Sequence, residues 1–146
     1  MSPDMEEEPS DRFITLMMRL RRLAPEQAAQ ISPSAMAIID FVASEPYCGV
    51  KDVARGLEVS APTVSVAVRQ LEDAGLIARQ AHPRDRRAVQ LFLTAQGQEI
   101  YDQTYLSRRK VFERLLASLT EEEQEIMLEL LTKALDDYDA TINSHS

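Results

Sequence analysis

Arginines near the middle of the chain are the residues whose type and spacing suggest the most specific chemistry. The run 79–87 contains one acid, Asp85, and four arginines: Arg79, Arg84, Arg86 and Arg87. A guanidinium group binds phosphate oxygens through two parallel hydrogen bonds, and an arginine at a narrow loop tip fits the minor groove of DNA. Asp85 would weaken a site built on charge alone, so we interpret it as orienting Arg87 through a charge-assisted hydrogen bond. The alternative is a solvated surface turn.

A second group of candidate residues lies at 60–71 and follows helical spacing. Ser60 is a typical N-cap, and the first helical turn tolerates Pro62 because an N–H there has no helical partner. Helical spacing turns an apolar stripe inward and a mostly polar face outward: Val64, Ala67, Val68 and Leu71 against Pro62, Thr63, Ser65, Val66, Arg69 and Gln70. Small polar side chains with one arginine suit a helix in the major groove, and a helix N-terminus offers N–H groups to a phosphate. Taken alone, an ordinary solvated helix face fits equally well.

The elements around these residues must hold a helix and a loop side by side. Residues 50–57 carry apolar side chains at helical spacing, and residues 58–60 form a turn into the second helix. After Gly75, a left-handed C-terminal cap, the pattern changes to two short strands at 76–79 and 88–93. Helix, turn, capped helix and basic-tipped hairpin follow each other in the order of a winged helix-turn-helix. This combination favours DNA binding over the two solvated alternatives.

Amphipathic helices flank this central segment. Ser10 or Asp11 is the predicted N-cap of a first helix, and Ser32 caps the next one. Thr94 caps a long helix that extends to about residue 119, and a Thr-x-x-Glu capping box at 120–123 opens the last helix. The two C-terminal helices have apolar stripes but no domain of their own, so we expect another surface to cover them.

Taken alone, the net charge of −8 argues against nucleic acid as a partner, but its distribution reverses that inference. Residues 1–9 carry −4 and residues 119–146 carry −7, whereas residues 10–118 carry +3. We therefore expect the acidic ends to lie away from a nucleic acid that binds the basic middle.

Composition argues against several other classes of protein. The longest apolar run, residues 35–39, is far shorter than the ~20 residues of a membrane span. The acidic N-terminus does not have the pattern of a signal peptide. The lone Cys48 forms no internal disulfide or cysteine-based zinc site, and two histidines, His82 and His145, are too few for a metal site. We expect a cytoplasmic protein without a metal or cofactor.

A series of short motifs runs from Ser32 to Gly97. The motifs are Ser32-Pro33, Val53-Ala54-x-x-Leu57-x-Val59-Ser60, Thr63-Val64-Ser65, Leu71-Glu72-x-x-Gly75-Leu76-Ile77, Asp85-Arg86-Arg87-Ala88 and Leu93-Thr94-x-x-Gly97. In order and spacing over these 66 residues, the chain resembles the MarR (multiple-antibiotic-resistance regulator) family of bacterial transcription factors. Each motif is moderately specific, while their combination is highly specific. The flanking helices agree in plan, so the resemblance covers nearly all of the chain except the acidic tail.

The resemblance implies a mainly α fold with a small β-hairpin, a winged helix-turn-helix with N- and C-terminal dimerisation helices. The implied parts are an acidic flexible tail at 1–9, a first dimerisation helix and connection at 10–31, a DNA-binding lobe at 32–93 and two dimerisation helices at 94–146. The implied function is sequence-specific regulation of transcription by a homodimer on a pseudo-palindromic double-stranded operator. Such a protein is expected to be a repressor that a small aromatic or anionic effector releases, and the effector site stays unassigned.

The resemblance also implies which residues contact DNA. On the recognition helix they are Ser60, Pro62, Thr63, Ser65, Val66 and Arg69, and on the wing they are Arg84, Asp85, Arg86 and Arg87. Two positions depart from the family pattern. Glu58 stands in the turn where glycine is frequent, so we expect the turn to cost backbone energy. Val66 replaces a usually basic or polar residue, and it either contacts a thymine methyl group or is half buried.

Two alternatives to this function stay open. A winged helix also serves as a protein-interaction module, and the acidic ends would then be the working surface. A redox-responsive regulator would use Cys48, although Lys51 is the one neighbouring cation that would activate the thiol. We do not expect an enzyme, because Cys48 and His82 lack a third orienting group at a recognisable spacing.

Overall fold

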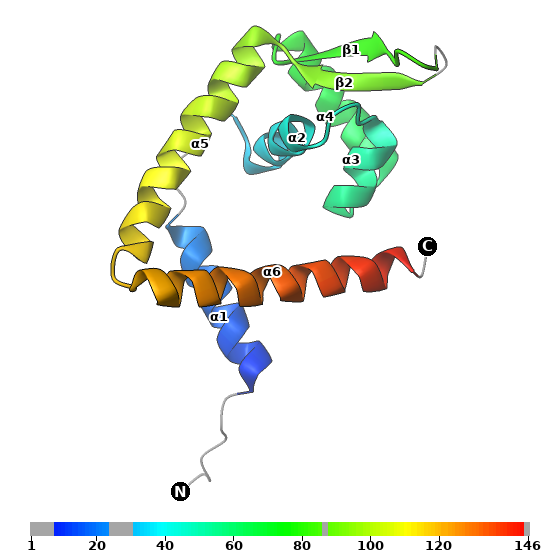
Figure 1. The fold of residues 1–146 in the computed structure, drawn as a ribbon. Helices are drawn as coiled ribbons and strands as arrows, with labels where there is room; N and C mark the ends of the chain where they lie inside the picture. The colour runs from blue at the N-terminus through cyan, green and yellow to red at the C-terminus, as the bar shows by residue number, and fades with distance from the viewer. Residues whose placement is uncertain (1–7, 24–30, 86–87, 145–146) are drawn as a thin grey trace, which may run out of the picture. The chain divides into compact units, whose positions relative to one another are not determined.

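The computed structural model describes residues 8–23, 31–85 and 88–144. In chain order, its elements are α1 (Pro9–Arg22), α2 (Pro33–Ser44), α3 (Val50–Leu57), α4 (Ala61–Asp73), β1 (Ile77–Ala81), β2 (Val89–Leu93), α5 (Ala95–Leu116) and α6 (Glu121–Asn143) (Figure 1). The chain divides into two compact units, residues 1–108 and 109–146. The prediction of a mainly α fold with a small β-hairpin is confirmed.

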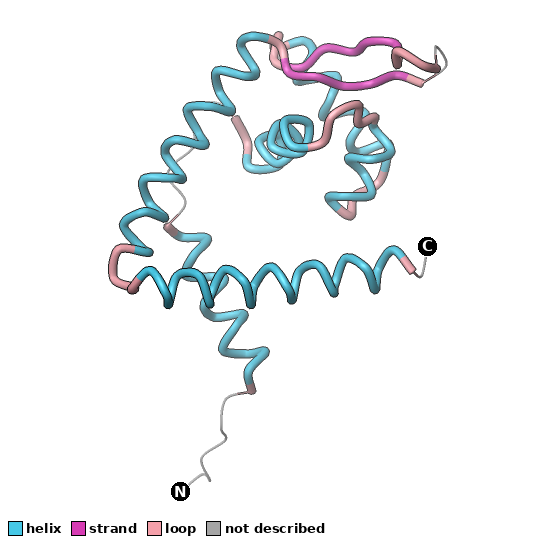
Figure 2. Tube along the Cα trace, in the orientation of Figure 1, coloured by secondary structure: helices cyan, strands magenta, loops and turns pink. Residues whose placement is uncertain are grey.

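The core of the first unit lies where α2, α3, α4 and the hairpin meet (Figure 2). Five side chains are less than 2% exposed: Met36, Ile39, Val53, Val64 and Val68. They come from all three helices, and Leu91 of β2 adds a buried side chain from the hairpin. The apolar stripes predicted for these helices therefore face one shared core.

The helices α2 and α3 begin at capped residues. Ser32 accepts a hydrogen bond on Oγ from the Ala35 N–H at 3.2 Å, and Pro33 occupies the first helical position. This is the predicted start of α2. At the start of α3, the Gly49 N–H donates to the Asp52 carboxylate at 2.8 Å. Both interactions satisfy backbone or side-chain groups that a bare helix end leaves without a partner.

The predicted N-cap of the first helix is wrong. The helix begins at Pro9, with Glu8 in the N-cap position, and not at Ser10 or Asp11. Proline is favoured in the first turn, because its fixed φ angle is helical and its missing N–H has no helical partner there. The helix therefore starts ahead of the polar residues that suggested its cap.

The hairpin is antiparallel, and its register pairs Ile77 with Leu93 at one end and Ala81 with Val89 at the other. The first strand begins one residue later than the predicted 76–79 and continues two residues further, and the second is one residue shorter than predicted. Pairing with β2 extends β1 beyond its apolar residues, a tertiary effect that the pattern of a single strand does not reveal.

A compact junction joins the end of α4 to the start of α5. Gly75 has a φ angle of +75°, the left-handed conformation predicted for it. The Thr94 hydroxyl donates to the Gly75 carbonyl oxygen at 2.5 Å and accepts from the Gly97 N–H at 3.1 Å. A Cβ atom on Gly97 would overlap the Leu76 carbonyl oxygen. The Leu-Thr-x-x-Gly motif is thus explained by a helix start packed directly on backbone.

The second unit contains the end of α5, a short turn and α6. The predicted capping box is confirmed: Glu123 N–H donates to Thr120 Oγ1 at 3.1 Å, and Thr120 N–H donates to Glu123 Oε1 at 2.9 Å. Gln124 Nε2 donates to the carbonyl oxygens of Leu116 and Leu119 at 2.9 and 3.2 Å. Since α5 ends at Leu116, it is three residues shorter than predicted.

Apolar side chains stay exposed on the flanking helices. Neither α1 nor α6 contains a buried residue. The exposed apolar residues of α1 are Phe13, Ile14, Leu16, Met17 and Met18, and those of α6 are Ile126, Met127, Leu128, Leu130, Leu131, Leu135, Tyr138 and Ile142. Among the described residues, no helix combines the length and apolar character needed to span a membrane.

Candidate nucleic-acid interface

Helix α4 has one buried face and one exposed face. Val64, Val68 and Leu71 are at most 5% exposed and fix the inner face against the core. The outer face carries the exposed residues Pro62, Thr63, Val66, Arg69 and Gln70, while Ser65 is partly buried. Val66 is 62% exposed, so the alternative that it is a half-buried contact is wrong. The predicted outward face is confirmed apart from the partial burial of Ser65.

The N-terminus of α4 is well capped. Ser60 Oγ accepts from the Thr63 N–H at 3.3 Å and lies 2.6 Å from Thr63 Oγ1. Since Pro62 has no N–H and the Thr63 N–H already has a partner, the first turn has fewer free N–H groups for a phosphate than the sequence suggested. Recognition by this helix therefore depends mainly on its exposed side chains.

The turn before α4 is made by a residue in a left-handed conformation. Glu58 has φ 55° and ψ 42°, as expected for a position where glycine is more usual. After it, the Val59 N–H donates to the Ala54 carbonyl oxygen at 3.0 Å, and Ala54 and Val64 are both buried. The turn thus packs α3 closely against α4, at the backbone cost that the sequence predicted.

The arginines predicted to form the basic hairpin do not all serve the same purpose. Arg79 Nε donates to Glu72 Oε1 at 2.6 Å, which joins β1 to the end of α4. The guanidinium of Arg79 is therefore a structural contact in the lobe. The basic character of the hairpin tip depends on the arginines beyond it.

Backbone hydrogen bonds shape the tip. His82 N–H donates to the Ala88 carbonyl oxygen at 2.8 Å, and Ala88 N–H donates to the Asp85 carbonyl oxygen at 3.0 Å. Arg84 N–H donates to His82 Nδ1 at 3.1 Å, and the side chains of Arg84 and Asp85 are exposed. Arg86 and Arg87 lie outside the described residues, and so does the predicted Asp85–Arg87 hydrogen bond.

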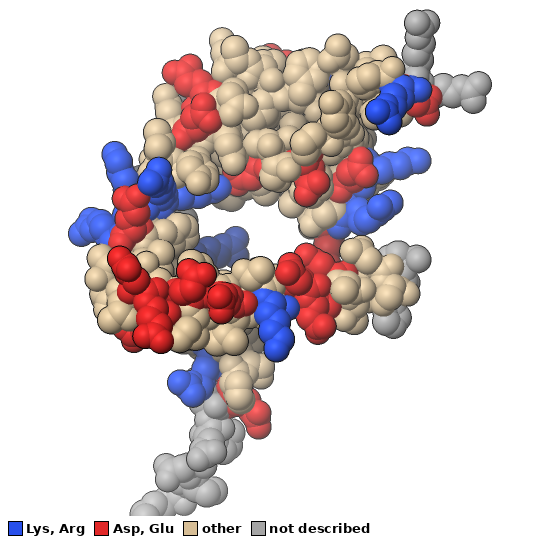
Figure 3. All heavy atoms as spheres, viewed as in Figure 1, with Lys and Arg blue, Asp and Glu red and all other residues tan. Residues whose placement is uncertain are grey.

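Exposed basic side chains of the lobe gather around these elements. Figure 3 shows them at the hairpin tip and over α3 and α4. Lys51 and Arg55 on α3 are exposed, as is Arg69 on α4. Among the described residues, no ion pair engages these three side chains. Sequence reasoning did not include Lys51 and Arg55 in the site, although their helical spacing places them on one face of α3.

Comparison with known proteins gives a consistent result. A family model described as MarR family matches residues 29–88. The HTH-type transcriptional repressor Rv2887 of Mycobacterium tuberculosis is 30% identical over 116 residues, which are 76% of this chain and 84% of the relative. This chain belongs to the MarR family. FabT of Streptococcus pneumoniae in complex with DNA is 26% identical with a TM-score of 0.68, covering 90% of this chain and 92% of that one. Staphylococcus aureus MepR bound to ethidium bromide is 25% identical with a TM-score of 0.64, covering 89% and 96%.

Family membership confirms the winged helix-turn-helix fold and a role in the regulation of transcription. In this MarR-family chain, α3 and α4 form the helix-turn-helix, and the β1–β2 hairpin is the wing. That the arginines of the wing tip contact DNA, and do not form a solvated surface turn, stays a prediction. The expectation that acidic ends and a basic middle have separate roles stays a prediction.

Tyr47 is a residue at the wing that the sequence did not single out. Its φ angle is 63° and its side chain is 63% exposed. The ring centroid lies 5.7 Å from that of His82, at an interplanar angle of 57°. The loop before α3 and the base of the wing tip therefore meet through two rings. The preceding proline marked a loop, but no local pattern predicted a positive φ at a tyrosine.

Cys48 connects the same loop to the wing and is not activated. It is 4% exposed, and its carbonyl oxygen accepts from the Leu91 N–H at 2.7 Å. Burial raises the pKa of the Cys48 thiol above its usual value, and the nearby carboxylate of Asp52 raises the pKa further. Since the thiolate is the reactive form, this environment argues against the redox-responsive alternative.

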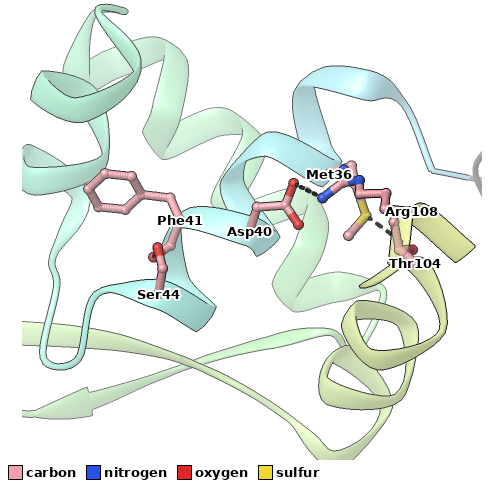
Figure 4. A network of polar contacts seen from close by, with 6 residues as sticks. All are labelled: Met36, Asp40, Phe41, Ser44, Thr104 and Arg108. Carbon is pink, nitrogen blue, oxygen red and sulfur yellow. Dashed lines mark hydrogen bonds and ion pairs between the residues drawn. The ribbon is translucent and has the colours of Figure 1, made fainter. Parts of the chain in front are cut away.

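A polar network connects α2 to α5 within the first unit (Figure 4). Arg108 NH1 donates to Asp40 Oδ2 at 2.9 Å, and Thr104 Oγ1 lies 3.9 Å from the Met36 sulfur. Asp40 Oδ1 is buried and has no hydrogen-bond partner among the described residues. The partners lie 68 residues apart in the chain, so no local motif predicted them. This contact fixes the middle of the long helix α5 to α2 of the lobe.

Proposed function

We propose that this MarR-family protein is a homodimeric repressor that inserts α4 into the major groove of a pseudo-palindromic operator. The observation that supports this most directly is the orientation of α4. Its buried stripe holds the helix in the lobe, so Thr63, Val66 and Arg69 project outward. They lie beside the exposed basic side chains of α3. The complex of FabT with DNA supports the same use of the fold here.

Each part of the surface has its own task in this proposal. Arg69 contacts a base edge or a phosphate, and the small residues Ser60, Pro62, Thr63 and Ser65 allow the first half of α4 to approach the groove floor. Arg84, Arg86 and Arg87 reach the minor groove, with Asp85 orienting Arg87. The lobe at 32–93 would bind DNA, and the remaining helices would hold the dimer.

A second copy of the chain is the proposed cover for the exposed apolar faces. Stripes as long as those of α1 and α6 would leave large apolar areas in water if the chain stayed a monomer. A two-fold dimer buries the same stripe on both copies, and it presents two α4 helices about one DNA turn apart. A pseudo-palindromic operator follows from this symmetry.

We further propose that a small aromatic or anionic effector releases the repressor from DNA. MepR, a relative at 25% identity, is solved with ethidium bromide, which supports an effector-responsive regulator here. The protein would act in the cytoplasm as a regulator and not as an enzyme, without a metal or cofactor. The described residues contain no group of three or more histidine, cysteine, aspartate or glutamate side chains suited to a metal ion.

Selection of duplex DNA from a random pool with the full chain tests the proposed function. We expect a pseudo-palindromic site whose affinity falls steeply with salt, since each phosphate contact releases a counterion. Arg69→Ala and Arg87→Ala are each expected to weaken binding to that site by about tenfold or more. Adding candidate aromatic acids to the complex then tests release.

Arg109→Ala is the matched control. It removes the same charge from the second unit, where Arg109 pairs with Glu113 at 2.8 Å. We expect unchanged affinity, because a surface ion pair contributes little to the fold. A chain that prefers no duplex sequence at low salt would overturn the proposal. A selected site that Arg69→Ala and Arg87→Ala both bind as tightly as the wild type would overturn it as well. Capture of a protein partner by such a chain would instead favour an interaction module.

A further inference from the structure

Val66 is the apolar residue on the otherwise mostly polar outer face of α4. Its side chain is 62% exposed, more than the exposed valines at 59 and 89, which are 44% and 49% exposed. Residues three and four positions apart share a helix face, so Val66 lies between Thr63 on one side and Arg69 on the other. It is therefore central to the surface that α4 presents.

Nothing in the described lobe accounts for a valine at this position. The core is closed on the opposite side of the helix by Val64 and Val68, which are at most 1% exposed. Valine is also a weaker helix former than alanine, because its branched side chain loses rotamer freedom in a helix. Neither packing nor helix stability thus favours valine here, and a role at the outer surface is the physical explanation that is left.

We infer that Val66 determines base specificity by packing against the 5-methyl group of a thymine in the major groove. Valine has no hydrogen-bond donor or acceptor, so it cannot read the polar edge of any base. Among the four bases, only thymine presents a methyl group in that groove. In a helix the branched side chain has one strongly preferred rotamer, which holds its two methyl groups in place before DNA binds.

The neighbours of Val66 are suited to position this contact. Thr63 lies one turn before it, and its hydroxyl lies 2.6 Å from the Ser60 hydroxyl, which orders the first turn. Arg69 lies one turn after it and is exposed, so it can bind a phosphate or the adjacent base. Polar contacts on both sides would fix the register of α4, while Val66 selects the base between them.

This inference rests on the proposed function, since it requires α4 to enter the major groove. The test therefore starts from the operator that the full chain selects. Each thymine of a half-site is replaced in turn by deoxyuridine, which keeps every hydrogen-bonding group and removes only the methyl group. We expect one position per half-site at which this change weakens wild-type binding about fourfold, the scale of one buried carbon.

A double-mutant cycle assigns that loss to Val66. In Val66→Ala the same deoxyuridine operator should bind within about 1.5-fold of the thymine operator, because the partner of the methyl group is gone. Val66→Ile keeps a branched apolar side chain, so it should still bind the deoxyuridine operator more weakly than the thymine operator. Val89→Ala is the matched control, because Val89 is an exposed valine of the wing. This variant should also bind the deoxyuridine operator more weakly than the thymine operator.

The outcomes distinguish this inference from the function on which it rests. Selective binding by the wild-type chain, with equal deoxyuridine effects in wild type and Val66→Ala, would overturn the role of Val66 and leave the proposed function intact. Selected half-sites without a common thymine would do the same. A wild-type chain that selects no sequence would overturn both. Because alanine favours helix, Val66→Ala is expected to fold, which circular dichroism checks.

Discussion

The winged lobe and the flanking helices differ in where their apolar side chains go. The lobe buries its stripes in a core that includes five side chains less than 2% exposed, whereas α1 and α6 contain no buried residue. Both have similar amphipathic patterns, so the pattern alone does not say whether its partner is in the same chain. The lobe is thus stabilised by packing within one chain, and the exposed stripes support the proposal that a partner surface covers the flanking helices.

The largest effect is expected where α5 packs on the lobe, at Gly97. Gly97→Ala places a Cβ atom on the Leu76 carbonyl oxygen, and backbone on both sides leaves little room for relaxation. We expect a loss of about 3 kcal/mol in the free energy of unfolding, measured by urea denaturation. Since the clash lies within one chain, the loss should not depend on protein concentration.

Gly56→Ala is the comparison for this variant. Its Cβ atom would overlap the ring of Phe41, a side chain that can turn aside. A smaller loss than that of Gly97→Ala is therefore expected. Equal losses in the two variants would contradict the explanation of the Leu-Thr-x-x-Gly motif as a backbone-to-backbone contact.

A substitution at Leu130 tests whether the flanking helix α6 is covered by a second copy of the chain. It is 62% exposed on the apolar stripe of α6, so Leu130→Ala should leave the lobe intact. If a second copy covers the stripe, the substitution should weaken dimerisation by about 2 kcal/mol per chain, because about three carbons leave a buried site. Sedimentation equilibrium measures this change.

Leu128→Ala supplies the matched control on the same helix. Leu128 is 48% exposed but shares a face of α6 with the polar residues Glu125, Thr132 and Asp136. We expect it to leave the dimer dissociation constant unchanged. A chain that stays monomeric at high concentration, or a Leu128 effect as large as that of Leu130, would contradict the proposed cover.

A smaller gain is expected at the turn between α3 and α4. Glu58 has a left-handed conformation that costs a non-glycine residue about 1–2 kcal/mol, while glycine in its place loses more entropy on folding. Glu58→Gly should therefore stabilise the chain by about 0.5 kcal/mol in urea denaturation. Glu99→Gly, an exposed helical position in α5, should instead destabilise it by about 1 kcal/mol. Destabilisation by both variants would mean that Glu58 is not strained.

The parts of the fold that could be predicted from sequence are those governed by neighbouring residues. Ser32, Ser60 and the box at 120–123 form caps as predicted, because a cap depends on residues three positions apart. The helix face that includes Val66 followed from its period. Of the predicted contact residues, Ser65 proved partly buried, since period alone does not resolve a residue at the edge of a stripe.

Long-range contacts account for what sequence reasoning missed. Arg79 was counted with the basic tip, but its partner Glu72 lies on α4, seven residues away and across the turn at Gly75. The Asp40–Arg108 contact joins residues 68 positions apart. Such pairs depend on how helices pack, and packing is a property of the folded chain and not of a local pattern.

The smallest expected effect belongs to the flanking helix α6, in the pH dependence of its cap. Hydrogen bonds from the backbone N–H and the hydroxyl of Thr120 lower the pKa of Glu123 below the usual 4.5. A lowered pKa in the folded state contributes stability above pH 4.5, and this contribution disappears as the pH falls through the folded value. Thermal unfolding of wild type and Glu123→Gln should therefore differ less at pH 3 than at pH 6.

Glu129→Gln distinguishes the effect of the capping box on the pH dependence of stability from the effect of the net charge of α6. Glu129 is exposed in the middle of α6, so the substitution removes the same charge without changing the capping box. Its difference from wild type should vary less with pH between 3 and 6 than that of Glu123→Gln. Because α6 is expected to be stable only when covered, the comparison is made at a concentration where the dimer is populated. An equal pH dependence in both variants would assign the effect to the net charge of α6 and remove the capping box as its cause.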